Sequence, residues 1–298
     1  MNIKHRFIAL LMSLVLLGSF AMSAFAADEG DTRVTLGADL NADEIAAVYK
    51  IFGVDRGQVE ELVVTNADER AYLEGLVSDA AIGTRAISCT YLEVLGPGNN
   101  ITVKTENISY CTASMYISAL ATAGITDAKV IVAAPFEVSG TAALTGIYKA
   151  YEVITGEKLD ETAKEVSSQE LAVTSELAQD IGDADSVEIV NQLKLILNET
   201  VKMSDDELRQ QIIDIAANYD VTLTDAQINQ LMKLVRSLEK LDTSALLEKV
   251  RAVQDSLKKF LSLSEKASGF TESVRQFFQQ VGETATNVWN YIVSIFKK

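Results

Sequence analysis

The hydrophobic and polar positions of the chain follow one pattern before about residue 156 and another after it. Before that point, short apolar runs alternate with helical stretches, separated by both prolines and most of the glycines. After it, apolar residues recur at intervals of three or four over long segments, as on one face of an amphipathic helix. The pattern predicts an α+β domain over 27–156, a small sheet with packed helices, followed by an all-α region over 157–298.

The α+β region contains signals for particular elements. Asn41 and Glu44 are spaced as a capping box, and so are Asn66 and Glu69, which predicts a helix start at each site. The segment GPGNN at 96–100 is a strong turn signal between two strand-like runs, so it predicts a hairpin. We expect helices at 41–52, 66–76, 112–123 and 141–155, strands at 59–65, 87–95, 101–108 and 129–134, and a loop at 135–140.

The second region is predicted to be a series of helices. Its apolar residues form narrow stripes at heptad spacing over 246–260 and again over 270–295, which is typical of helices in antiparallel bundles. We expect these stripes to pack within the chain. Capping boxes are predicted for Asp185 with Glu188, Ser204 with Glu207, and Thr224 with Gln227.

The N-terminus has the features of a secretory signal peptide. A positive segment at 4–6 precedes an apolar segment at 7–20, and the A-x-A sequence at 24–26 is a cleavage site. The apolar segment is shorter than the ~20 residues that are needed to span a bilayer. We therefore expect residues 1–26 to be removed by cleavage near Ala26, which predicts a secreted, extracytoplasmic protein.

Charge and composition exclude several classes of function. The chain carries 42 acidic and 26 basic residues, a net charge of −16, and such a surface repels nucleic-acid phosphates. Its one histidine, His5, is removed with the signal peptide. The mature chain then lacks the histidine that Ser-His-Asp and Cys-His catalysis and histidine-ligated zinc require. We expect no nucleic-acid partner, no metal site, no cofactor and no catalytic residue of these kinds.

The chain has two cysteines, Cys89 and Cys111. An oxidising extracytoplasmic compartment favours their pairing, and no C-x-x-C motif indicates a redox role. On the predicted hairpin, Cys89 lies on the first strand and Cys111 lies just beyond the second, a little out of register. We predict a disulfide between them, with two separate buried thiols as the alternative.

A candidate binding site lies where a predicted buried strand is followed by a helix, at Ser139, Gly140 and Thr141. Free N–H groups at a helix N-terminus attract anions, and the two hydroxyls would add hydrogen-bond donors. The alternative is a cap, in which Ser139 or Thr141 bonds the first turn of the helix. A serine nucleophile here would need Lys149 as its base, and Lys149 lies too far along the helix.

The C-terminal segment is a candidate interaction region. From residue 233 onward basic residues outnumber acidic ones, whereas the rest of the chain is acidic. We expect one helix over 270–298, packed mainly within the chain, with its aromatic end partly exposed. Alternatively, this helix binds a protein partner or a second copy, or makes peripheral contact with an anionic membrane. The residues of this candidate surface are Phe277, Phe278, Trp289, Ile292 and Phe296.

Four segments of the chain resemble the YpuA-like family, secreted proteins of Gram-positive bacteria classed as a domain of unknown function. They are LGADL at 36–40, VTNADE at 64–69, IGTRAIS at 82–88 and ALATAGITDAKVIVAAPFEVSGTAALTGIY at 119–148. The resemblance covers most of the mature chain. It implies an extracytoplasmic protein of Gram-positive type and carries over no catalytic residue, substrate or cofactor.

Two functions are compatible with these features. The first is a non-enzymatic extracytoplasmic protein that binds or organises a component of the cell envelope, with an unknown envelope component or protein as its partner. The alternative is a metal-independent envelope hydrolase that uses carboxylates. A deep pocket with two facing carboxylates, one with a strongly raised pKa, would favour the hydrolase, and the absence of such a pocket would favour the binding protein.

Overall fold

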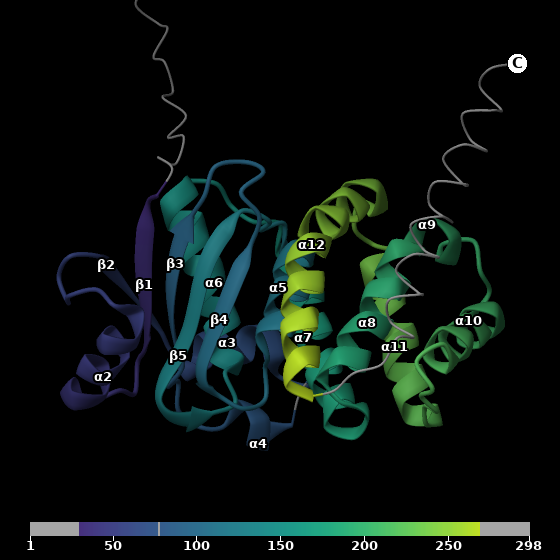
Figure 1. Cartoon of the computed structure of the whole chain (residues 1–298), viewed down its shortest axis with the longest axis horizontal. Helices are drawn as coiled ribbons and strands as arrows, with labels where there is room; N and C mark the ends of the chain where they lie inside the picture. The colour runs from purple at the N-terminus through teal and green to yellow at the C-terminus, as the bar shows by residue number, and fades with distance from the viewer. Residues whose placement is uncertain (1–29, 77, 269–298) are drawn as a thin grey trace, which may run out of the picture.

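The computed structural model describes residues 30–76 and 78–268 (Figure 1). A sheet with its helices lies at one end of the described chain, and a group of helices lies at the other. The predicted fold class, an α+β region followed by a helical region, is therefore confirmed. The predicted signal peptide at 1–26 and the predicted interaction helix at 270–298, with its five candidate side chains, lie outside the described residues.

A mixed sheet of five strands forms the first region: β1 (Thr32–Gly37), β2 (Glu60–Val64), β3 (Cys89–Val94), β4 (Thr102–Ile108) and β5 (Ala128–Val138). Their order across the sheet is β2-β1-β3-β5-β4. The outer pairs, β1 with β2 and β4 with β5, are parallel, and β3 runs antiparallel to both of its neighbours. Each parallel pair has a crossover helix, α2 (Ala42–Phe52) or α5 (Ala113–Ala123), because a short turn cannot connect parallel strands.

The predicted hairpin between residues 87–95 and 101–108 is wrong. β5 lies between β3 and β4, so Ile131 pairs with Tyr91 on one side and with Lys104 on the other. The turn residues form a loop across the end of β5, where the backbone N–H of Leu95 donates to the carbonyl oxygen of Asp127. The apolar run of β5 favours a central position in the sheet, and the more polar β4 forms an edge.

Two further strand predictions need correction. β1 was not predicted, although Val34 and Leu36 alternate with polar neighbours as in a half-buried strand. β5 continues through Pro135 to Val138, where a loop was expected. Proline is tolerated there because β3 pairs only as far as Ala133, so the N–H that proline lacks is not needed on that side.

Helices cover both faces of the sheet. On one face, α2 packs against side chains that include Val34 and Tyr91. On the other face, α5 and α6 (Thr141–Thr155) cover side chains that include Leu92 and Val130. Tyr91 and Leu92 are neighbours in the chain and point to opposite faces, as the geometry of a strand requires.

The second region is helical, as predicted, and it packs directly on α5. Its helices are α7 (Glu161–Ile181), α8 (Asp183–Leu195), α9 (Leu197–Thr200), α10 (Asp205–Ala217), α11 (Asp225–Leu238) and α12 (Thr243–Ser268). The apolar stripe of α12 is buried within the chain, and Val253 and Leu257 belong to the same core cluster as Leu92 of the sheet. One hydrophobic core therefore continues across residue 156, and α5 lies between the sheet and α12 (Figure 1).

The predicted helix starts are partly confirmed. The capping boxes at Asn41, Ser204 and Thr224 are present. The predicted box of Asp185 with Glu188 is wrong, because α8 begins at Asp183, directly after a glycine that offers no side-chain cap. Among the described helices, none is both long enough and apolar enough to cross a bilayer.

The start of α3 (Asn66–Leu73) differs from the prediction in a way that affects the site. Thr65 is the N-cap, and it forms the capping box with Asp68, where Asn66 and Glu69 were expected to do so. The Thr65 side chain and the Asp68 carboxylate satisfy each other's backbone N–H groups. Because Asp68 fills this role, the carboxyl group of Glu69 can turn into the protein.

The predicted disulfide is also wrong, because both cysteines are free and buried. Cys89 starts β3 and belongs to the core on the α2 face, whereas Cys111 belongs to the core on the face covered by α5 and α6. Because β5 lies between β3 and β4, the axes of β3 and β4 are ~10 Å apart. A disulfide needs Cα atoms within about 4.4–6.8 Å of each other, so the sheet keeps the two thiols apart.

Candidate functional site

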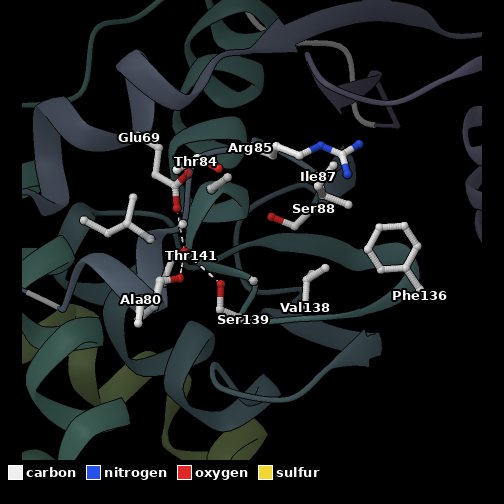
Figure 2. A pocket seen from close by; sticks show the side chains of 15 residues that line it. Glu69, Ala80, Thr84, Arg85, Ile87, Ser88, Phe136, Val138, Ser139 and Thr141 are labelled. Atoms are coloured by element: carbon white, nitrogen blue, oxygen red, sulfur yellow. Dashed lines mark hydrogen bonds between the residues drawn. The ribbon is translucent and has the colours of Figure 1, made fainter.

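A pocket of about 280 Å³ lies at the N-terminus of α6, and Figure 2 shows the side chains that line it. Three stretches of the chain meet there: Glu69 of α3, residues 80–88 with the end of α4 (Asp79–Ile82), and residues 136–142. The candidate residues Ser139, Gly140 and Thr141 all line this space, which we call the α6 pocket. The structure therefore adds α3 and the residues after α4 to the predicted site.

The N-terminus of α6 opens into the pocket without a side-chain cap. Gly140 is the N-cap residue, with φ of 94°, and neither Ser139 nor Thr141 bonds the first turn. The alternative prediction, that one of these hydroxyls caps the helix, is therefore wrong. Glycine is needed here for its backbone angle and for space, because a Cβ atom would lie 2.8 Å from the Tyr116 hydroxyl oxygen.

Thr141 connects the start of α6 to the carboxyl group of Glu69. Its hydroxyl donates a 2.5 Å hydrogen bond to Glu69 Oε1, and Ser139 Oγ lies 3.1 Å from Thr141 Oγ1 (Figure 2). The other carboxyl oxygen, Glu69 Oε2, has a longer contact of 3.4 Å with Asn66 Nδ2. The Glu69 side chain is only 1% exposed, so the carboxyl group forms the buried wall of the pocket.

Burial raises the pKa of Glu69 from 4.5 to about 7, against the opposing effects of its hydrogen bonds from Thr141 and Asn66. Arg70 lowers this pKa only weakly, because its guanidinium group is bound elsewhere. Arg70 Nη1 lies 2.9 Å from Asp79 Oδ1, and Nη2 donates to the carbonyl oxygen of Gly83. Within residues 30–76 and 78–268, Glu69 has no ion-pair partner, so both of its protonation states are accessible near neutral pH.

Ser88 contributes a hydroxyl group that faces the pocket. It lines the α6 pocket just before β3 begins, and its side chain is 5% exposed. Figure 2 shows the hydroxyl turned toward the part of the pocket where Glu69 and Thr141 meet. Within the described part of the chain this hydroxyl makes no hydrogen bond, and it is open to the space of the pocket. A ligand or a water molecule in the pocket would pair with it.

The open side of the pocket is lined by Arg85 and Phe136. Arg85 is exposed, and its Nη2 donates to the backbone oxygen of Asp39. Phe136 is 43% exposed, which is unusual for an aromatic ring on a sheet strand. The pocket thus has a polar, buried inner end and a rim that offers one cation and one aromatic ring.

The α6 pocket is lined by hydrogen-bonding groups and a single carboxyl group. Glu69 is the one carboxylate among the described residues that line it, so the pair of facing carboxylates expected for a hydrolase is not present there. No group of three or more metal-ligating side chains occurs among the described residues. What the pocket offers is a set of hydrogen-bond donors from Ser88 and the start of α6, beside a carboxyl group that titrates near pH 7.

Sequence reasoning located one of the three stretches and missed two. The strand-to-helix pattern indicated Ser139 and Thr141, but Glu69 was assigned to a cap, and Ser88 was not singled out. Ser88 did carry a signal, since it is a polar residue inside an otherwise buried run before β3. Three of the segments that resemble the YpuA-like family, 64–69, 82–88 and 119–148, supply nearly all of the residues that line the pocket.

Comparisons with known proteins agree with that resemblance. The model of a family described as "Protein of unknown function (DUF1002)" matches residues 36–260, which include all residues of the α6 pocket. A protein of Bacillus subtilis (strain 168), named "Uncharacterized protein YpuA", is 40% identical over 271 residues, which cover 90% of each chain. No solved structure matches the chain.

Proposed function

Because this chain belongs to the DUF1002 family of proteins of unknown function, we propose its function from the pocket. The protein is a secreted, non-enzymatic binding protein of the cell envelope, and the α6 pocket holds its ligand. The observation that carries this proposal is the hydroxyl of Ser88, a residue that is 5% exposed; this hydroxyl faces the pocket and makes no hydrogen bond within the described part of the chain. A ligand oxygen would replace the water that pairs with this hydroxyl, for a net gain of about 0.5–1.5 kcal/mol.

Secretion is supported by the sequence of the N-terminus. The positive segment, the apolar segment and the A-x-A sequence near Ala26 follow the order of a signal peptide. The resemblance to secreted proteins of Gram-positive bacteria supports the same location. We therefore place the ligand outside the cytoplasm, among the soluble components of the envelope.

The alternative function is a hydrolase with Glu69 as its acid. The raised pKa of Glu69, about 7, is a property of catalytic acids that work at neutral pH, and this favours the alternative. A carboxylate hydrolase also needs a second carboxylate as nucleophile or base, within about 10 Å of the first. Among the described residues that line the pocket, Glu69 has no such companion, so binding is the better-supported function.

The test measures binding and turnover with the same material. Soluble fragments of a Gram-positive envelope, muropeptides and glycerol-phosphate oligomers, are added to the full mature chain, and the melting temperature is recorded. We expect at least one fragment to raise the melting temperature of the wild type and of Ser244→Ala, which changes an exposed serine on α12. The same fragment should have little effect on Ser88→Ala.

Three outcomes would contradict the proposal. If no fragment raises the melting temperature, or if Ser88→Ala responds as the wild type does, the α6 pocket is not the ligand site. If the fragments are cleaved, and Glu69→Gln abolishes the cleavage, the protein is the hydrolase. Mass spectrometry of the fragments before and after incubation separates binding from cleavage.

A further inference from the structure

We infer that the α6 pocket binds an oxyanion, the carboxylate or phosphate group of its ligand, together with one proton that Glu69 holds. This inference rests on the proposed function, because it names the chemical class of ligand for the same site. Three features of the site support it: the donors that face the pocket, the position of the Glu69 carboxyl group, and the charges around that group.

The donors in the pocket match an oxyanion. α6 has 15 residues and no side-chain cap, so the N–H groups of its first turn are without side-chain partners and carry the positive end of the helix dipole. The hydroxyl of Ser88 comes from a different segment and faces the same space without a partner in the described chain. Arg85 adds a positive charge at the rim, whereas the Ser139 hydroxyl donates to Thr141 Oγ1 and is not among the donors to a ligand. Helix N-termini with such donors are common anion sites.

The carboxyl group of Glu69 decides when an anion can enter. As a carboxylate, it would put a negative charge at the buried end of the pocket and would repel a ligand anion. As a neutral acid, it can accept from the Thr141 hydroxyl at Oε1 and donate its proton from Oε2 to a ligand oxygen. Oε2 is suited to this role because its one hydrogen bond among the described residues, from Asn66 Nδ2, is weak at 3.4 Å and leaves the oxygen available to a ligand. The proton comes from solvent when the anion binds, and it returns to solvent when the anion leaves.

The charged groups around Glu69 are paired with each other. Arg70 is bound to Asp79, and Lys149 lies 2.9 Å from Asp68, whose pKa is lowered to about 2 by hydrogen bonds that outweigh its burial. Two neutral groups of the core also face Glu69, namely Cys111, whose pKa burial raises to about 12, and Tyr116. The titratable and charged groups around Glu69 are Asp68, Arg70, Asp79, Arg85, Cys111, Tyr116 and Lys149.

Three of these neighbours have a pKa that is shifted away from the range between pH 6 and pH 8. Hydrogen bonds that include one from Lys149 lower the pKa of Asp68 to about 2, and burial raises the pKa of the Cys111 thiol and of the Tyr116 phenol. Glu69, with a pKa of about 7, is the group that titrates in this window. The anion affinity of the pocket should therefore follow the protonated fraction of Glu69.

The experiment uses two anions whose own charge is constant from pH 6 to pH 8. Sulfate represents a phosphate group and acetate represents a carboxylate, and each is titrated into the full mature chain while the amide NMR signals of Ser88 and Thr141 are followed. The protonated fraction of Glu69 is about nine tenths at pH 6 and about one tenth at pH 8. We therefore expect the Kd of the bound probe to be about tenfold higher at pH 8 than at pH 6.

Three variants distinguish the effect of the Glu69 proton from that of the other groups in the pocket. Glu69→Gln has a neutral side chain that can donate and accept as the protonated acid does, so we expect it to bind the probe with less than about twofold difference between the two pH values. Glu74→Gln is the matched control, since Glu74 is exposed at the end of the same helix and should leave the tenfold dependence intact. Ser88→Ala should weaken binding at both pH values.

The outcomes distinguish the inference from the proposed function. A preference for sulfate or for acetate identifies a phosphate or a carboxylate as the group recognised. Equal affinity at pH 6 and pH 8 would overturn the role of Glu69. No binding of either probe at pH 6, while envelope fragments still raise the melting temperature, would overturn the ligand class and leave the proposed function in place. If Glu69→Gln does not fold, the titration of Glu69 is followed in the wild type by its ¹³C carboxyl signal. The inference requires the pKa from this titration to be higher with the probe than without it.

Discussion

Lys194 Nζ lies 2.8 Å from Glu170 Oε1, and both side chains are buried where α5, α7 and α8 meet. Lys194 also donates to the carbonyl oxygen of Ser118, and the hydroxyls of Ser118 and Thr122 each donate a 2.5 Å hydrogen bond to Glu170. Burial lowers the pKa of Lys194, and the negative charge of Glu170 opposes this effect. The network fixes the helical region onto α5, which is the crossover helix of the sheet.

Replacing Lys194 by methionine should strongly destabilise the protein. The substitution keeps most of the side-chain volume but leaves the Glu170 carboxylate buried without its cation, which costs about 3–5 kcal/mol. The free energy of unfolding from urea titration measures the loss. Lys158→Met is the control, because the side chain of Lys158 is 83% exposed and its ion pair with Glu152 should contribute less than about 1 kcal/mol. A loss of less than about 1 kcal/mol in Lys194→Met would show that the pair contributes little.

The buried carboxyl of Glu69 should make the protein more stable in weak acid than at neutral pH. Its pKa rises from 4.5 to about 7 on folding, so the native state holds the proton more tightly than the unfolded chain. The stabilisation is complete below about pH 4.5 and is lost as the pH rises through 7, by on the order of 3 kcal/mol. Urea titrations at pH 5 and pH 8 measure it as the difference between the wild type and Glu69→Gln. If this difference does not change with pH, the carboxyl group is not buried as described.

Gly37→Ala should destabilise the protein more than Gly146→Ala does. A Cβ atom on Gly37 would lie 2.6 Å from the backbone carbon of Ala86 and 2.8 Å from the backbone nitrogen of Ile87, and neither atom can rotate away. On Gly146, the added methyl group would meet the side chain of Thr35, which can adopt another rotamer. We expect a loss of about 3 kcal/mol for Gly37→Ala and about 1–2 kcal/mol for Gly146→Ala in the free energy of unfolding. The reverse order would show that this backbone contact is not close.

The fold class was predictable from local patterns, but the strand order was not. Each helix start depends on residues within four positions, so the boxes at Ser204 and Thr224 could be identified from spacing alone. The position of β5 between β3 and β4 depends on which strand buries more apolar surface in the centre, and that is a comparison across the whole sheet. A turn signal indicates that the chain changes direction, and it does not identify which strands become neighbours.

The same distinction applies to the site. Ser139 and Thr141 were identified because a strand, a loop and a helix start leave a pattern within a few residues. The hydrogen bond between Thr141 and Glu69 joins residues that are 72 positions apart, and no local spacing indicates it. Glu69 was mistaken for a capping residue because either Asn66 or Thr65 could serve as the N-cap, and a shift of one position changes which acid closes the box. With Thr65 as the N-cap, Asp68 closes the box at the surface and Glu69 faces the α6 pocket.

The last prediction concerns the two thiols. Because Cys89 and Cys111 are free, buried and on opposite faces of the sheet, neither should react with a thiol reagent in the native protein. Burial also raises the pKa of each thiol to about 12, so the reactive thiolate is scarce at neutral pH. Alkylation in denaturant without reductant should add two adducts to the intact mass, and alkylation without denaturant should add none. If no adduct forms in denaturant until a reductant is added, the thiols are joined and the strand order must differ from the one described. Adducts on the native protein would show instead that one of the two core clusters opens to solvent.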